Sequence, residues 1–170
     1  TAVLVHPRLT EPEAQVLIDD AEVALSLDDA GVDALLHDGV TRRWPAMPRC
    51  ELSAPLAMIY TSGTSGRPKG AVLTHGAFAA SAAASERNLG WEHPDRWVAA
   101  LPIAHVSGLS VLTRCLRAGR PVVLLPRFDA DAVLDAVRSG GTLVSVVPTM
   151  LRALLEADRD NVLARARALL

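Results

Sequence analysis

The sequence predicts an α/β fold in which helices flank a largely parallel sheet. Short, continuous apolar runs recur along the 170-residue chain, and they lack the alternation typical of strands with one face in water. Segments with helical spacing of apolar residues separate these runs. Strands that alternate with helices are typical of βαβ units. We therefore expect strands at residues 2–5, 23–27, 56–60, 97–101, 122–125 and 143–147.

Three helices are predicted from their end residues as well as from their spacing. Thr10 and Glu13 form a capping-box pattern ahead of a stretch with apolar residues on one face. Asp129 can cap a helix that closes at the glycine pair 140–141. Pro148 suits the first turn of a helix with Met and Leu on one face.

Other segments are assigned by composition. Residues 38–55 are rich in Arg and Pro and are predicted to be a connecting loop before the strand at 56–60. An alanine-rich helix is expected near residues 77–84. The chain opens almost inside a strand and ends in ARARALL, so we expect a piece of a longer domain; a C-terminal helix is the other interpretation of that ending.

Composition excludes several classes of protein. A net charge of -2 gives no reason to expect a nucleic-acid partner. No apolar run approaches the ~20 residues of a membrane helix, and the opening lacks the layout of a signal peptide. Cys50 and Cys115 are too few and too isolated for a disulfide framework or a zinc site. These features favour a cytoplasmic protein without a membrane span.

The stretch YTSGTSGRPKG, residues 60–70, places the only lysine of the chain, Lys69, after a run of hydroxyls and glycines. The glycines allow positive φ and close backbone approach, so that successive N–H groups can converge on an anion: Gly63, Gly66 and Gly70. Four hydroxyls add donors: Thr61, Ser62, Thr64 and Ser65. With Lys69 as a mobile cation, the segment is predicted to hold a polyphosphate, on a loop between two strands.

Two other interpretations of this loop are weaker. A P-loop has Gly-Lys-Ser/Thr at the start of a helix, whereas Pro68 and Gly70 flank Lys69 here. A flexible Ser/Gly linker would require neither the preceding strand nor the Pro-Lys-Gly ending.

The eleven residues closely resemble the signature loop of the adenylate-forming superfamily, which includes acyl- and aryl-CoA ligases, luciferases and peptide-synthetase adenylation domains. Ser65 stands where the commonest form has Thr. The resemblance implies that residues 61–66 and Lys69 hold the β- and γ-phosphates of ATP, with Thr64 beside Mg²⁺. Lys69 would follow the phosphate as it leaves, because an ammonium on a flexible stem is less rigid than a guanidinium.

A second motif, LPIAHVSGLSVLTRCLRAG at residues 101–119, follows a predicted strand and opens a helix at about Ser107. A histidine at a strand end is often structural, but the carboxyl ends of strands are where α/β sheets bind ligands. By resemblance, His105 lies beside the substrate carboxylate. The segment is also similar to the o-succinylbenzoate–CoA ligases of menaquinone biosynthesis, which implies substrate contacts from Ser107, Gly108 and Arg114. Arg114 could face a second carboxylate, or it could be a solvated helix arginine.

The resemblance covers nearly the whole chain and implies that residues 1–170 are a central part of an AMP-binding N-terminal domain. The implied enzyme activates a carboxylic acid with ATP and Mg²⁺ to an acyl-adenylate, then transfers the acyl group to coenzyme A. A general aryl- or fatty-acyl–CoA ligase and a noncatalytic nucleotide-binding or interaction module remain alternatives, as does assembly into a homo-oligomer. The isolated chain is expected to be inactive, because the family's adenine and ribose contacts and its C-terminal lysine lie downstream.

Overall fold

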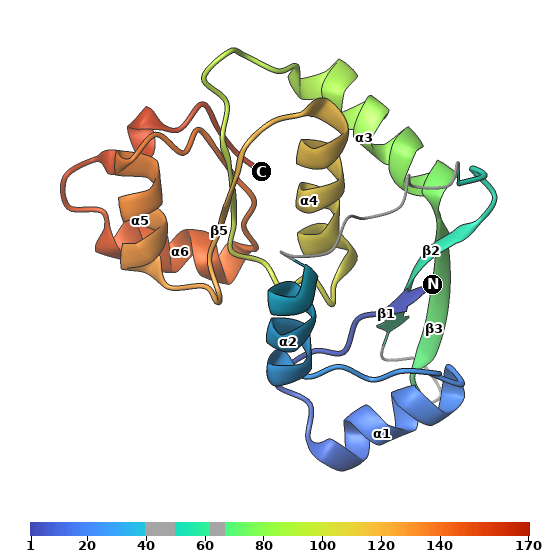
Figure 1. Cartoon of the computed structure of the whole chain (residues 1–170). Coiled ribbons are helices and arrows are strands. Elements are labelled where there is room, and N and C mark those ends of the chain that lie inside the picture. Colours follow the sequence, from blue (N-terminus) through green and yellow to red (C-terminus); the bar gives the residue numbers. More distant parts are fainter. Residues whose placement is uncertain (40–49, 62–66) are drawn as a thin grey trace.

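The computed structural model describes residues 1–39, 50–61 and 67–170. In these ranges the chain forms two sheets with helices packed around them (Figure 1). One sheet has the strand order β1-β2-β3 and the other β5-β4-β6-β7. The elements follow in chain order: β1 (Ala2–Val3), α1 (Glu11–Asp20), α2 (Asp29–Gly39), β2 (Pro55–Thr61), β3 (Lys69–Thr74), α3 (His75–Leu89), β4 (Trp97–Ala99), α4 (Val106–Ala118), β5 (Val122–Leu124), α5 (Ala130–Arg138), β6 (Leu143–Val144), α6 (Pro148–Ala157), η1 (Val162–Arg165) and β7 (Ala168–Leu169).

The predicted α/β fold with a largely parallel sheet is confirmed. All pairings in β5-β4-β6-β7 are parallel, and β1 is parallel to β2. The exception is the antiparallel pair β2–β3, which the loop of residues 62–68 connects. The prediction that this loop joins two strands is therefore confirmed.

One predicted strand is wrong. Residues 23–27 are not a strand, and Leu25 and Leu27 are exposed. The segment leads into helix α2, which we did not predict. Asp28 marks the start of that helix, because its side-chain Oδ1 accepts a hydrogen bond from the Gly31 N–H at 2.8 Å.

The predicted helix starts are confirmed. The Glu13 carboxylate accepts hydrogen bonds from the N–H and the hydroxyl of Thr10, at 2.8 and 2.7 Å. Asp129 Oδ1 accepts from the Ala132 N–H at 2.9 Å, and Pro148 is the first residue of α6. The Asp129 bond satisfies an N–H group of the first turn that has no partner within the helix. The Glu13 bonds order Thr10, the residue before α1.

Two further assignments, the connecting loop and the C-terminal helix, differ from the structure, and part of the loop lies outside the described residues. The predicted loop 38–55 starts within α2, which ends at Gly39; residues 40–49 lie outside the described residues, and residues 50–54 have no regular structure. At the other end of the chain, residues 168–169 form β7 beside β6, so the C-terminal helix interpretation is wrong.

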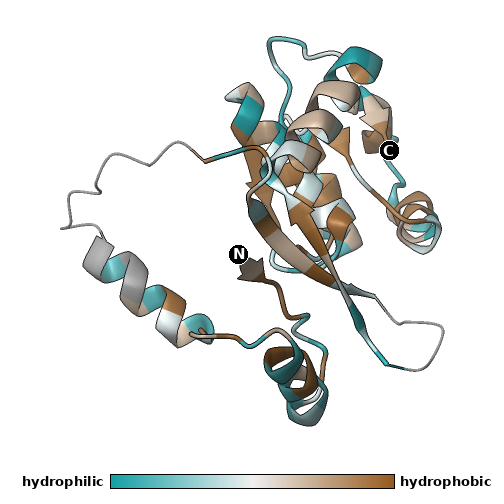
Figure 2. Ribbon diagram, turned by 90° about the vertical axis from the view of Figure 1, so that its right-hand side faces the viewer, coloured by the Kyte–Doolittle hydropathy of each residue, from teal (hydrophilic) through white to brown (hydrophobic). Residues whose placement is uncertain are grey.

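The central strands of the parallel sheet, β4 and β6, are buried on both faces, which explains their uninterrupted apolar runs. Val98 and Ala100 pack with α5, α6 and η1, whereas Trp97 and Ala99 pack with α4 on the opposite face. Successive strand residues point to opposite faces, so a strand covered on both sides needs apolar residues at every position. In Figure 2 the strands in the body of the molecule are largely brown, the colour of apolar residues, and helices lie around them.

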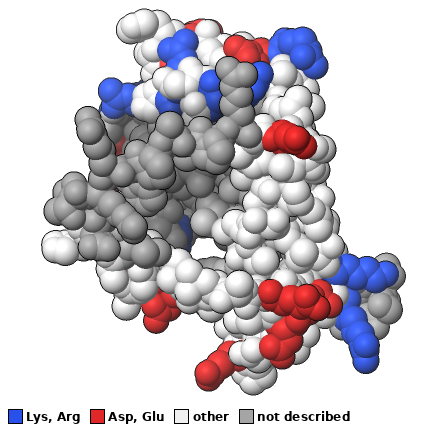
Figure 3. Space-filling model, turned by 45° about the vertical axis from the view of Figure 1, so that its right-hand side comes forward, with Lys and Arg blue, Asp and Glu red and all other residues white. Residues whose placement is uncertain are grey.

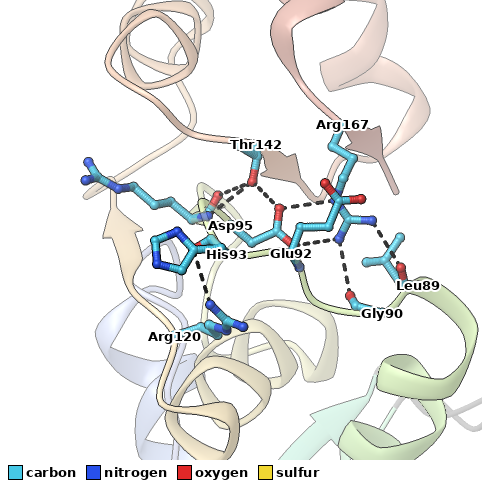
Figure 4. Close-up of polar contacts among 9 residues, drawn as sticks. Leu89, Gly90, Glu92, His93, Asp95, Arg120, Thr142 and Arg167 are labelled. Atoms are coloured by element: carbon cyan, nitrogen blue, oxygen red, sulfur yellow. Dashed lines mark hydrogen bonds and ion pairs between the residues drawn. The ribbon is translucent and has the colours of Figure 1, made fainter.

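A buried ion pair holds the segment before β7 against the loop before β4 (Figure 4). The Arg167 guanidinium donates to both carboxylate oxygens of Asp95, at 2.7 and 3.1 Å, and to the carbonyls of Leu89 and Gly90. Thr142 Oγ1 also donates to Asp95, at 2.7 Å. Asp95 is only 1% exposed, so this cluster provides nearly all of its solvation.

Candidate functional site

A cavity of about 960 Å³ opens between three parts of the chain that are distant in sequence. One wall is the segment after β1 together with α1. The second is the end of β2 and the residues just before β3, on either side of the connecting loop. The third is the residues just before α4. The lining residues are Leu4, His6, Leu9, Glu13, Val16, Leu17, Asp20, Tyr60, Thr61, Arg67, Pro68, Ala104 and His105.

This cavity joins the two motifs that the sequence singled out. Thr61, Arg67 and Pro68 flank the predicted phosphate loop, and His105 belongs to the predicted acid site. Lys69 pairs with Thr61 in the strand register, and its exposed side chain is not among those that line the cavity. The other predicted phosphate contacts lie outside the described residues: Ser62, Gly63, Thr64, Ser65 and Gly66.

Gly70 does not have the positive φ that the sequence suggested for it. It lies in β3, where a Cβ atom would come within 2.7 Å of the Met58 sulfur and 3.1 Å of the Tyr60 ring. A larger residue here would have to displace the Met58 side chain of β2, so this position favours glycine.

His105 is exposed at the start of α4 and occupies its N-cap position. Its side chain makes no capping hydrogen bond, and its ring centroid lies 5.2 Å from that of His6. The start of a helix carries unpaired N–H groups and a partial positive charge. The imidazole and the helix start therefore form a place where a carboxylate would be stabilised.

Of the other predicted acid contacts, Gly108 is buried and Ser107 is exposed, both in the first turn of α4. A Cβ atom on Gly108 would collide with the backbone carbonyl oxygens of Leu101 and Pro102. Gly108 thus lets α4 begin directly against the segment that follows β4, and this contact fixes where His105 stands.

Arg114 lies two turns further along α4 and does not line the cavity. Its guanidinium carbon is 5.4 Å from the Trp97 ring centroid, a cation–π contact. Burial lowers the pKa of Arg114, and its Nε is buried without a hydrogen-bond partner among the described residues. The alternative of a freely solvated helix arginine is therefore wrong. A contact of Arg114 with a second carboxylate stays a prediction.

Sequence reasoning missed five polar residues of the cavity, although it named Glu13 for its capping role: His6, Glu13, Asp20, Tyr60 and Arg67. The sequence shows that His6 closely follows a predicted strand, but not which strand that one pairs with. In the structure His6 follows β1 by only a few residues, and β1 runs parallel to β2, so the residues after both strands lie at the same edge of the sheet. Asp20 gave no such signal, because its place depends on how α1 packs.

A hydrogen bond from Tyr60 connects β2 to α1. Its hydroxyl donates to Asp20 Oδ2 at 2.6 Å, and burial together with the neighbouring Asp20 carboxylate raises the pKa of Tyr60 to about 12. Tyr60→Phe should lower the free energy of unfolding by about 1 kcal/mol at neutral pH, because a side-chain hydrogen bond is lost.

The same contact has a defined pH dependence. The folded state holds the Tyr60 proton more tightly than the unfolded chain, so the stabilisation is complete below pH 10 and declines as the pH rises toward 12. Urea unfolding between pH 8 and 11 should show the wild-type advantage over Tyr60→Phe shrinking with pH. Since Tyr60 is the only tyrosine, a constant difference would contradict the assignment.

The charged side chains of the described surface form no broad field on the face in Figure 3. Where that face is coloured, most of it is white, and basic and acidic side chains lie next to each other in small groups at the top and at the lower right. No helix among the described residues is long and apolar enough to cross a membrane. Likewise, residues 1–39, 50–61 and 67–170 contain no cluster of three or more His, Cys, Asp or Glu that could hold a metal ion.

The chain was compared with known families and proteins. A family model described as AMP-binding enzyme matches residues 1–170. The 2-succinylbenzoate–CoA ligases of Bacillus cereus and Bacillus anthracis are each 38% identical over 165 residues, which cover 91% of this chain and 34% of the relative. The chain thus spans about a third of the length of these curated relatives.

Two solved structures are also similar to this chain. The o-succinylbenzoate coenzyme A synthetase (MenE) of Bacillus subtilis in complex with AMP is 30% identical, with a TM-score of 0.80 over 99% of this chain and 47% of that one. Apo MatB from Rhodopseudomonas palustris is 25% identical, with a TM-score of 0.77 over 96% of this chain and 38% of that one.

Proposed function

The chain belongs to the AMP-binding enzyme family, and from this we propose that it is part of an ATP-dependent acid–CoA ligase. The names of the relatives support 2-succinylbenzoate, also called o-succinylbenzoate, as the acid. This is the acid that the motif at residues 101–119 suggested, and with it a place in menaquinone biosynthesis and in the cytoplasm. The chain would contribute part of the N-terminal domain of that enzyme.

The cavity is the observation that carries this proposal. It places His105 and the start of α4 in one space with Thr61 and Arg67, which flank the loop that resembles the family's phosphate loop. In the proposed reaction a carboxylate oxygen of the acid bonds to the α-phosphorus of ATP, and pyrophosphate leaves. The thiol of coenzyme A then bonds to the acyl carbon, AMP leaves, and the thiol proton passes to solvent.

The described residues beside the loop suit polyphosphate. A hydroxyl, a guanidinium and an ammonium, from Thr61, Arg67 and Lys69, are all donors that phosphate oxygens accept from. Their role would be to stabilise charge that develops on the departing pyrophosphate. Mg²⁺, when bound, would neutralise part of that charge, with Thr64 as its proposed neighbour.

Pyrophosphate exchange by the intact enzyme tests the proposal. We expect exchange that depends on 2-succinylbenzoate, with much weaker exchange on benzoate or a fatty acid. Exchange on those acids alone would indicate a general aryl- or fatty-acyl–CoA ligase, and none on any acid would indicate a noncatalytic module. The isolated 170-residue chain should form no acyl-adenylate. It should also self-associate, because exposed leucines such as Leu155 and Leu170 line an apolar groove of about 390 Å³.

Arg114 is tested by comparing acids with one and two carboxylates. Arg114→Met keeps much of the packing against Trp97 but removes the charge. If the guanidinium pairs with a second carboxylate, this variant should raise the KM for 2-succinylbenzoate about tenfold and leave benzoate unaffected. His105→Ala, in contrast, should weaken both acids and leave the KM for ATP unchanged. Equal losses on the two acids for Arg114→Met would leave it a packing role only.

A further inference from the structure

His6 faces His105 across one wall of the cavity. The two ring centroids are 5.2 Å apart and the rings are tilted by 46°, and both side chains line the cavity. His6 comes from the segment after β1, whereas His105 precedes α4, so the fold brings together two imidazoles that the sequence separates widely.

The hydrogen bonding of His6 fixes which nitrogen carries its proton. The Arg8 N–H donates to His6 Nδ1 at 3.1 Å, so in the neutral ring the proton lies on Nε2. Burial and the nearby His105 and Arg8 lower the pKa of His6, which favours this neutral form. His6 is thus a hydrogen-bond donor through Nε2, and no acceptor for that N–H is found in the described part of the chain.

The carboxylates of the cavity are already engaged. Glu13 accepts from the N–H and hydroxyl of Thr10, and Asp20 accepts from Tyr60 at 2.6 Å. No hydrogen bond among the described residues joins either carboxylate to the histidine pair, which leaves both rings accessible to a molecule bound in the cavity. A carboxylate has two oxygens, and each can accept a hydrogen bond from a different ring.

We propose that His6 is an acid-binding residue whose Nε2–H donates to the carboxylate that the enzyme activates, beside His105 and the start of α4. This inference rests on the function proposed above and adds a residue that neither sequence motif contains. The two rings would hold the carboxylate in the cavity that Thr61 and Arg67, the residues on either side of the phosphate loop, also line.

Two substitutions separate binding from a structural role in the turn before α1. Glutamine places its amide at about the reach of Nε2, whereas asparagine places its amide near Nδ1 and can still accept from the Arg8 N–H. In pyrophosphate exchange, His6→Ala and His6→Asn should raise the KM for 2-succinylbenzoate about tenfold with the KM for ATP unchanged. His6→Gln should recover most of the affinity. The matched control is His93→Ala, because His93 is exposed and, within the described ranges, its backbone carbonyl rather than its ring accepts the hydrogen bond from Arg120.

Recovery by asparagine but not by glutamine would overturn the proposal, as would an unchanged KM in His6→Ala. A second readout separates this proposal from the enzymatic one: nitrogen-15 resonances of the histidine rings, recorded with 2-succinylbenzoate in the absence of ATP. Shifts at His6 and His105 without any pyrophosphate exchange would reject the ligase and keep the carboxylate site. Exchange with an unaffected His6 resonance would reject the site alone, and the absence of both would reject both.

Discussion

Replacing Lys69 with alanine should slow adenylate formation by about 100-fold or more in the intact enzyme. The lysine begins β3, directly after the loop. Its side chain is exposed, and its backbone pairs with Thr61. A cation with this freedom can follow pyrophosphate as charge develops on it, and the loss of one such stabilising group costs about 100-fold or more in rate. Pyrophosphate exchange measures this step directly.

Lys69→Arg should restore only part of the rate, because a guanidinium keeps the charge but offers a rigid, wider fork. Arg117→Ala is a suitable control, since Arg117 is exposed in the last turn of α4, away from the cavity. Exchange by Lys69→Ala at the wild-type rate would exclude a role for Lys69 in phosphate chemistry.

The second large effect is on folding. Arg167→Ala should lower the free energy of unfolding by about 3 kcal/mol, because it leaves the Asp95 carboxylate buried with its main partner removed. The substitution also leaves the carbonyls of Leu89 and Gly90 without their guanidinium donor. Urea unfolding followed by tryptophan fluorescence can report this change, since Trp97 lies in the core beside the cluster.

The control for this prediction is an exposed ion pair. Arg138 pairs with Asp135 and Asp160, whose side chains are 71% and 77% exposed, so Arg138→Ala should lower the free energy of unfolding by less than about 1 kcal/mol.

The ion pair of Asp95 also has a pH dependence. Burial raises the pKa of Asp95, but hydrogen bonds from Arg167, the Glu92 N–H and Thr142 outweigh it and hold the pKa below its ordinary value. The advantage of the wild type over Arg167→Ala should therefore be full at neutral pH and fall away in acid, as Asp95 is protonated. Equal losses in the two alanine variants would contradict this account.

Local chemistry made most of the fold predictable. Caps at Thr10 and Asp129, proline at residue 148 and apolar runs buried on both faces all act over a few residues, and the sequence displays them directly. The error at residues 23–27 arose because an apolar run becomes a strand only if another strand is available to pair with it. Nothing within the run itself shows whether such a partner exists.

The candidate site was predictable where a motif marks it and unpredictable where tertiary packing forms it. The loop and His105 were found from contiguous residues, and the structure places His105 and the ends of the loop on one cavity. The contact between His6 and His105 depends on the pairing of β1 with β2, which no local pattern encodes. The same holds for Arg114, whose burial against Trp97 depends on how α4 lies on the sheet.

The parallel pairing of β1 with β2 has a consequence for the order in which the molecule assembles. β1 is only two residues long, and Ala2 pairs with Ala57 across both α1 and α2. Within the described residues its partner is β2, and closing so long a connection costs entropy before the pairing contacts repay it. The hairpin β2–β3 can form locally in the meantime. The wall that carries His6 should thus complete the cavity late in folding, and amide hydrogen exchange should show it opening before β4 and β6 in the native protein.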